Sequence, residues 1–128
     1  MGFDRSPFTH HIGGSGKTVQ AKPVLLAVSA REVEGRVVVT VGGELDIATV
    51  PTLAALLDEV IESSTCPIEL DLDGVRFLGA AAVRVLQVGA RRCAHAGRTL
   101  SLRNTNEQMR HVLSVHARHA REPYALRW

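Results

Sequence analysis

The residues from Gly13 to Thr18 read Gly-Gly-Ser-Gly-Lys-Thr, and their types and spacing suggest phosphate chemistry. A phosphate-binding loop of this kind wraps backbone N–H groups and a lysine around the phosphates of a nucleotide. It needs a glycine five positions before Gly16, where this chain has His11, and it must follow a buried strand. Because neither condition is met, we predict no nucleotide site and no bound cofactor.

Histidines and paired carboxylates offer two further chemistries, metal binding and acid–base catalysis. His111 and His116 lie five residues apart, on different faces of a helix, and only His116 and His119 could share one face. No cysteine or acidic cluster completes a ligand set for them. Asp71 and Asp73 share one face of a strand, but no positioned acid, base or nucleophile accompanies them. The sequence therefore predicts a protein that is not an enzyme and that holds no metal.

The seven residues from Phe77 to Val83 read Phe-Leu-Gly-Ala-Ala-Ala-Val and join a predicted strand to a predicted helix. The first N–H groups of a helix lack intrahelical partners, and the helix dipole is positive there, so such a join suits a phosphate or a carboxylate. No Ser, Thr or Tyr occurs from Cys66 to Arg98. The join therefore has no hydroxyl of its own to offer.

Length and composition fit one compact domain. The chain has 128 residues, 45% of them apolar and 22% charged, which is enough for a hydrophobic core without disulfides. Its five aromatic residues are too few to stack the bases of single-stranded nucleic acid. The longest apolar run, Val24 to Val28, is too short to span a bilayer, and the first five residues do not resemble a signal peptide. We expect a cytoplasmic protein that binds no nucleic acid and inserts into no membrane.

The formal net charge of +2 hides two oppositely charged halves. Residues 24 to 75 hold ten acidic and two basic residues, whereas residues 76 to 128 hold ten arginines and two acidic residues. Strands from both halves should interleave in one sheet and mix their electrostatic fields. Two interpretations stay open for the basic half, an ordinary solvated surface and a basic helical face that meets an acidic partner.

Hydrophobic periodicity positions these residues on an ordered series of elements. Residues 1–22 are polar and rich in glycine, and we expect a flexible N-terminal arm there. Two runs rich in β-branched residues, 24–28 and 36–41, predict a hairpin whose second strand ends at Gly42-Gly43. A helix should open at Thr49-Val50-Pro51 and close at Ser63-Ser64-Thr65. The remaining predicted elements are strand 67–73, a helix from 80 to about 95, strand 99–103, a helix from 107 to about 118, and an edge strand over 124–128. This order, ββαβαβα with the last strand optional, predicts an α/β domain over residues 23–128 with a mixed sheet.

Three of these segments resemble the STAS domain family, named for sulphate transporters and anti-sigma factor antagonists. They are Gly43-Glu44-Leu45-Asp46, the strand Leu70 to Val75, and Phe77-Leu78 before a helix of small residues. The likeness covers about Val24 to Trp128. It implies a mixed sheet of four to five strands with helices packed on one side, and it implies an anti-sigma factor, itself a serine kinase, as the partner.

The resemblance also implies a phosphorylation switch that this chain has lost. The bacterial antagonists carry a pattern similar to Phe-Met-Asp-Ser-Ser-Gly-Leu, and their partner kinase phosphorylates the first serine, which blocks binding. Here Gly79 stands at the aspartate position and Ala80 at the phosphorylated serine, with Ala81 at the second serine. A phosphate adds about −1.5 to −2 of charge to an interface. This chain cannot use that switch.

Two functions follow from the resemblance. In the first, Ala80 mimics the permanently unphosphorylated state and the domain binds an anti-sigma factor. The contacts include Glu44 and Asp46. The contact surface continues over Gly79, Ala80, Ala81, Arg84 and Val88. In the second, a degenerate relative serves as an interaction subunit of a transporter or of another signalling complex.

Two features of the chain concern redox state and assembly. Cys66 and Cys93 should lie near the same end of the domain, where reduced thiols are the expectation and a redox-linked disulfide is the alternative. Relatives commonly end with a further helix, whereas this sequence stops at Trp128. Dimerisation, or covering by the N-terminal arm, would protect the apolar surface that a missing helix leaves.

Overall fold

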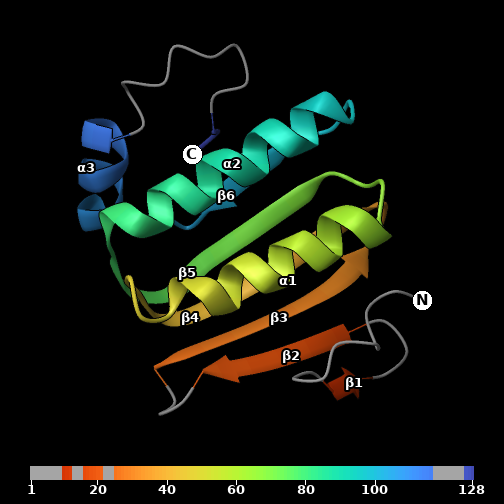
Figure 1. The fold of residues 1–128 in the computed structure, drawn as a ribbon, viewed down its shortest axis with the longest axis horizontal. Helices are drawn as coiled ribbons and strands as arrows, with labels where there is room; N and C mark the ends of the chain where they lie inside the picture. Colours follow the sequence, from red (N-terminus) through yellow and green to blue (C-terminus); the bar gives the residue numbers. More distant parts are fainter. Residues whose placement is uncertain (1–9, 13–15, 22–24, 117–125) are drawn as a thin grey trace.

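The computed structural model describes residues 10–12, 16–21, 25–116 and 126–128 (Figure 1). The elements in chain order are β1 (His10–Ile12), β2 (Gly16–Ala21), β3 (Leu26–Val33), β4 (Arg36–Leu45), α1 (Val50–Ser63), β5 (Ile68–Leu78), α2 (Ala80–His95), β6 (Leu100–Arg103) and α3 (Glu107–His116). Within these ranges, no helix combines the length and the apolar character that crossing a membrane requires.

One mixed sheet organises the molecule, with its six strands in the order β1-β2-β3-β4-β5-β6. The first four strands pair antiparallel, and β4, β5 and β6 pair parallel. Glu34 and Gly35 connect β3 to β4 with φ values of 49° and 82°, the positive values that a tight two-residue hairpin turn needs. The parallel strands are connected through α1 and α2, because a parallel pair requires a crossover.

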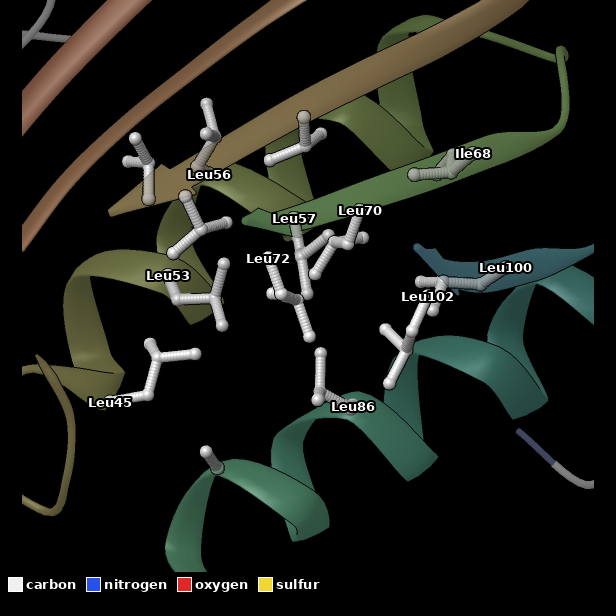
Figure 2. Packing of buried hydrophobic residues seen from close by; sticks show 14 of the residues in the cluster. Leu45, Leu53, Leu56, Leu57, Ile68, Leu70, Leu72, Leu86, Leu100 and Leu102 are labelled. Carbon is white, nitrogen blue, oxygen red and sulfur yellow. The ribbon is translucent and has the colours of Figure 1, made fainter. Parts of the chain in front are cut away.

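The hydrophobic core lies between one face of the sheet and the helices (Figure 2). Alternate residues of β3, β4 and the first half of β5 are buried, and the residues between them are half-buried or exposed. This period of two is the signature of a sheet that is covered on one face. Figure 2 shows Leu57 of α1 and Leu86 of α2 gathered with Leu70 and Leu72 of β5, which places both helices on that face.

Local sequence explains where the helices begin and end. Pro51 occupies the first turn of α1, where its missing N–H has no partner to lose. The Asn106 side chain accepts a hydrogen bond of 2.8 Å from the Met109 N–H and so caps α3. Gly97, with φ of 76°, follows the end of α2. Both α1 and α2 begin and end within the segments that the sequence predicted for them.

Strands β3 to β6 and the three helices form the mixed α/β fold that the sequence predicted, and two further strands extend the sheet at one edge. The extra strands, β1 and β2, lie in the region expected to be a flexible arm, and β2 pairs with β3 along six residues. The division of the chain into an arm and a domain stays a prediction. At the opposite edge, the Arg127 carbonyl accepts a 2.8 Å hydrogen bond from Leu102, in agreement with the predicted edge strand, whose residues 124 and 125 lie outside the described ranges.

Candidate functional site

The candidate site lies along the border of the sheet that is formed by the carboxyl ends of the parallel strands β4 and β5. In the pairing register Glu44 lies opposite Phe77 and Leu45 opposite Leu78. The Gly79 N–H then donates a 2.8 Å hydrogen bond to the Leu45 carbonyl. Parallel pairing therefore brings together two of the predicted segments, the Gly-Glu-Leu-Asp loop and the start of α2. We call this region the β4/α2 edge.

The start of α2 offers backbone and methyl groups to a partner. Gly79 is the N-cap residue and makes no side-chain cap, and the first turn of α2 carries no acidic residue. Ala80 is exposed and Ala81 is half-buried, whereas Ala82 and Val83 point into the core. The first turn of α2 therefore presents small apolar side chains at the positive end of the helix dipole.

Asp46 organises the turn between β4 and α1. Its Oδ1 accepts hydrogen bonds from the N–H groups of Ala48, at 3.0 Å, and Thr49, at 3.1 Å. Thr49 is buried, and its hydroxyl donates a 2.5 Å hydrogen bond to the Glu44 carbonyl. The Asp46 carboxylate thus has a structural role, and the Thr49 hydroxyl at this edge is not available to solvent.

Glu44 and Arg76 form the charged rim of the same edge. The Glu44 carboxylate lies 3.8 Å from the Arg76 guanidinium, and both side chains are largely open to solvent. An exposed pair of this kind contributes at most about 1 kcal/mol, so a partner could rearrange it at little cost.

Two exposed apolar side chains at this edge were not in the predicted site. Ile47 is 81% exposed in the turn after β4, and Phe77 is 46% exposed at the end of β5. A Cβ atom built on Gly79 would lie 3.3 Å from the Phe77 ring, so this ring lies beside the start of α2. An isoleucine between Asp46 and Ala48 in a polar turn is the sequence signal that could have revealed this patch.

Gln108 of α3 fixes the end of β5 from the other side. Its Oε1 accepts a 3.3 Å hydrogen bond from the Leu78 N–H, and its Nε2 donates one of 3.2 Å to the Leu78 carbonyl. The side-chain amide thus replaces a strand partner where β6 is too short to provide one. No local pattern in the sequence indicates this contact.

Arg84 and Val88 are exposed on α2, away from the β4/α2 edge but continuous with it along the helix. They border a groove of about 330 Å³ between α1 and α2. The structure thus divides the predicted site into two adjoining parts, the β4/α2 edge and this α1/α2 groove.

The two cysteines are free, and Arg98 contacts the backbone of both. The Arg98 Nη1 donates a 3.0 Å hydrogen bond to the Cys66 carbonyl, and the Arg98 N–H donates one of 2.9 Å to the Cys93 carbonyl. Burial raises the pKa of the Cys93 thiol, partly offset by the positive charges of Arg98 and Arg92. The redox pair stays a prediction.

The described residues contain no group of three His, Cys, Asp or Glu side chains that could hold a metal ion. His111 and His116 are exposed on α3, and His119 lies outside the described ranges. Gly16, Lys17 and Thr18 lie in β2, paired with Arg31, Ala30 and Ser29, in extended rather than loop conformation.

Comparison with protein families identifies the domain. The family model described as "Mlab, STAS domain" matches residues 28–117, which is more than half of the chain. Two curated relatives, the anti-sigma-F factor antagonist RsfB from two strains of Mycobacterium tuberculosis, are each 30% identical over 64 residues. This match covers 50% of the chain and 52% of each relative, so the chain spans about half the length of the curated relatives it matches.

Solved structures show the same fold. An anti-sigma factor antagonist from Mycobacterium paratuberculosis matches with a TM-score of 0.63 and 23% identity, over 76% of this chain and 81% of that one. The Bacillus cell fate determinant SpoIIAA in its phosphorylated form matches with a TM-score of 0.58 and 21% identity, over 69% and 81% of the two chains. At these identities the likeness concerns the fold alone.

Proposed function

Because the chain belongs to the STAS domain family, we propose that it acts as an anti-sigma factor antagonist. It binds an anti-sigma factor and thereby frees a sigma factor for transcription in the cytoplasm. The observation that carries this proposal is the β4/α2 edge, where the exposed Phe77 lies beside the open helix start at Ala80 and the exposed Ile47 lies in the turn after β4. Exposed apolar side chains grouped in this way are typical of a protein-binding surface.

The proposed antagonist works without a phosphorylation switch. Ala80 has no acceptor oxygen, and the Thr49 hydroxyl at the same edge is buried and bonded to the Glu44 carbonyl. A kinase that binds this edge therefore finds no serine or threonine there to modify. The amount of the protein, rather than its phosphorylation, sets how much anti-sigma factor it sequesters.

Binding to a purified anti-sigma factor tests the proposal. The probe is the anti-sigma-F factor of Mycobacterium tuberculosis, the class of protein that the RsfB relative is named as antagonising. We expect titration calorimetry to give one dissociation constant with and without Mg-ATP, and mass spectrometry to find no phosphate on this chain. Absence of binding, or a complex that Mg-ATP dissolves with phosphate on this chain, would contradict the proposal.

A pair of matched variants locates the contact. Ala80→Glu puts a charge at the centre of the β4/α2 edge, and desolvating it should weaken binding by about tenfold or more. Ala96→Glu adds the same charge at the exposed far end of α2 and serves as the control. Equal affinity of both variants would remove Ala80 from the interface.

The alternative function, as an interaction subunit of a transporter, predicts a different result. An interaction subunit of a permease should leave the anti-sigma factor unbound and should instead be retained by a membrane protein complex. The relatives named as antagonists favour the first function.

A further inference from the structure

The α1/α2 groove has an apolar interior and no covering segment among the described residues. Its lining includes Ala54, Leu57 and Ile61 of α1 and Val85, Val88 and Gly89 of α2. Val88 is 47% exposed, whereas Val83 and Leu86 of the same helix are buried. Gly89 lies on the floor of the groove and lets α2 pack closely on the core, because a Cβ atom there would lie 3.3 Å from Leu100 and 3.7 Å from Leu57.

The two ends of this groove differ in charge. At one end Arg92 crosses from α2 to α1, where it pairs with Asp58 and lies 3.8 Å from the Glu62 carboxylate. At the other end Arg84 is exposed, and the described residues provide it with no ion pair. The positive end of the α2 dipole lies one turn away and has no acidic residue beside it. Positive charge is thus balanced at one end and unbalanced at the other.

We propose that the α1/α2 groove receives an amphipathic helix of the anti-sigma factor, with its apolar side chains on the floor and a carboxylate beside Arg84. The groove between two neighbouring helices fits the apolar stripe of a third one. The carboxylate would supply the negative charge that the Arg84 end lacks. This inference rests on the proposed function and adds a second contact, one turn along α2 from Ala80.

A second copy of the chain fits this groove less well than an acidic helix does. In a two-fold dimer the same patch faces itself. Parallel grooves would bring the two Arg84 side chains together, and like charges at such a contact are unfavourable. Antiparallel grooves would set Arg84 against an end whose carboxylates, Asp58 and Glu62, already lie beside Arg92. Self-association is therefore an outcome that the experiment must distinguish.

The test measures the affinity of groove variants for the same anti-sigma-F factor of Mycobacterium tuberculosis. Arg84→Glu reverses the unbalanced charge, Val88→Glu places a charge on the apolar rim, and Ala54→Leu fills the groove from the α1 side. We expect each to weaken binding by about tenfold. Val115→Glu, at an exposed valine on α3, and Ala55→Leu, at a neighbouring α1 alanine outside the groove lining, are the controls and should stay within about twofold.

Each result bears on the proposal. Loss of affinity in both α1 and α2 variants, with unchanged controls and unchanged thermal unfolding, supports a helix in the groove. Full affinity of the groove variants beside a weakened Ala80→Glu overturns this inference and leaves the proposed function intact. No binding by the unaltered chain overturns both. Sedimentation that shows a dimer of this chain, lost in Val88→Glu, assigns the groove to a second copy and also overturns the inference.

Discussion

Arg98 is a buried cation that holds two elements together. Its side chain is 8% exposed, and its guanidinium donates hydrogen bonds to the carbonyls of Ile61, in the last turn of α1, and Cys66. Carbonyls in the last turn of a helix lack intrahelical donors and carry partial negative charge. Arg98 therefore caps α1 from a distant part of the chain. Local patterns in the amino-acid sequence do not reveal this contact.

The Cys93 thiol lies near this cation and should make the free energy of unfolding depend on pH in the alkaline range. Burial raises its pKa above the ordinary value of 9.0, while Arg98 and Arg92 act in the opposite direction. Because the folded state then holds the proton more tightly than the unfolded state, the stabilisation is present below pH 9 and is lost as the pH rises through the folded pKa. We expect the free energy of unfolding to fall in this range by up to about 1.4 kcal/mol per pH unit.

Urea unfolding of the wild type and of Cys93→Ala, from pH 7 to pH 10.5, isolates this contribution. The variant loses some stability at every pH because a buried side chain becomes smaller. Only the wild type should show the additional decline above pH 9. Two curves that remain parallel would mean that the thiol ionises equally in both states.

At the scale of elements, the end of β4 depends on Gly43. This residue has φ of 111°, and the register with β5 shifts between Gly43 and Glu44. A Cβ atom on Gly43 would lie 2.1 Å from the Leu25 carbonyl oxygen, the same atom that accepts a 2.9 Å hydrogen bond from the Glu44 N–H. The irregularity thus lets β4 continue to the candidate site, as bulges commonly do beside functional residues.

Alanine substitutions at the two neighbouring glycines test this dependence. Gly43→Ala combines a strained φ with a clash against backbone, and we expect it to lower the free energy of unfolding by about 3 kcal/mol or more. Gly42→Ala meets its nearest atom, the Gly74 carbonyl oxygen, at 3.6 Å and should change stability by about 1 kcal/mol or less. Similar losses in chemical denaturation would show that the bulge is not what constrains Gly43.

The contrast between α1 and β4 shows what the sequence could predict. The bounds of α1 follow from Pro51 and from apolar residues at helical spacing, all of which are local signals. The sequence placed the end of β4 at Gly42-Gly43, but the strand continues to Leu45, because pairing with β5 and the Leu25 carbonyl supports it from outside. The predicted Glu44, Asp46 and Gly79 segments do meet in the structure. The Gln108 contact to Leu78 depends on tertiary packing and could not be predicted.

At the scale of the whole molecule, the two oppositely charged halves of the sequence form ion pairs where they adjoin. Glu69 of the acidic half lies 3.0 Å from Arg103 of the basic half, and Asp58 pairs with Arg92. The strands of the two halves do not interleave as the sequence predicted, because the sheet keeps chain order and β6 of the basic half lies beyond β3, β4 and β5. Opposite charges therefore meet where the halves adjoin, between α1 and α2 and between β5 and β6.

The outer strands raise the question of where the domain begins. The buried core described here starts at Leu26 and extends to Leu126, with members from β3 to β6 and all three helices. The strands β1 and β2 add an antiparallel edge, in which β2 pairs with β3 from Leu26 to Arg31. The sequence predicted residues 23–128 as the domain, and a chain reduced to those residues is the direct test.

We expect the shortened chain, residues 23–128, to fold with a melting temperature about 10 °C lower than that of the full chain. Removing β2 takes away the hydrogen bonds of one strand pair, and the net loss should be about 2 kcal/mol. It also leaves β3 as an open edge with unpaired N–H and carbonyl groups, which favours association between copies at high concentration. Circular dichroism would follow the melting, and sedimentation the association. A shortened chain without cooperative unfolding would instead make β1 and β2 integral parts of the domain, and its boundary would then lie before residue 10.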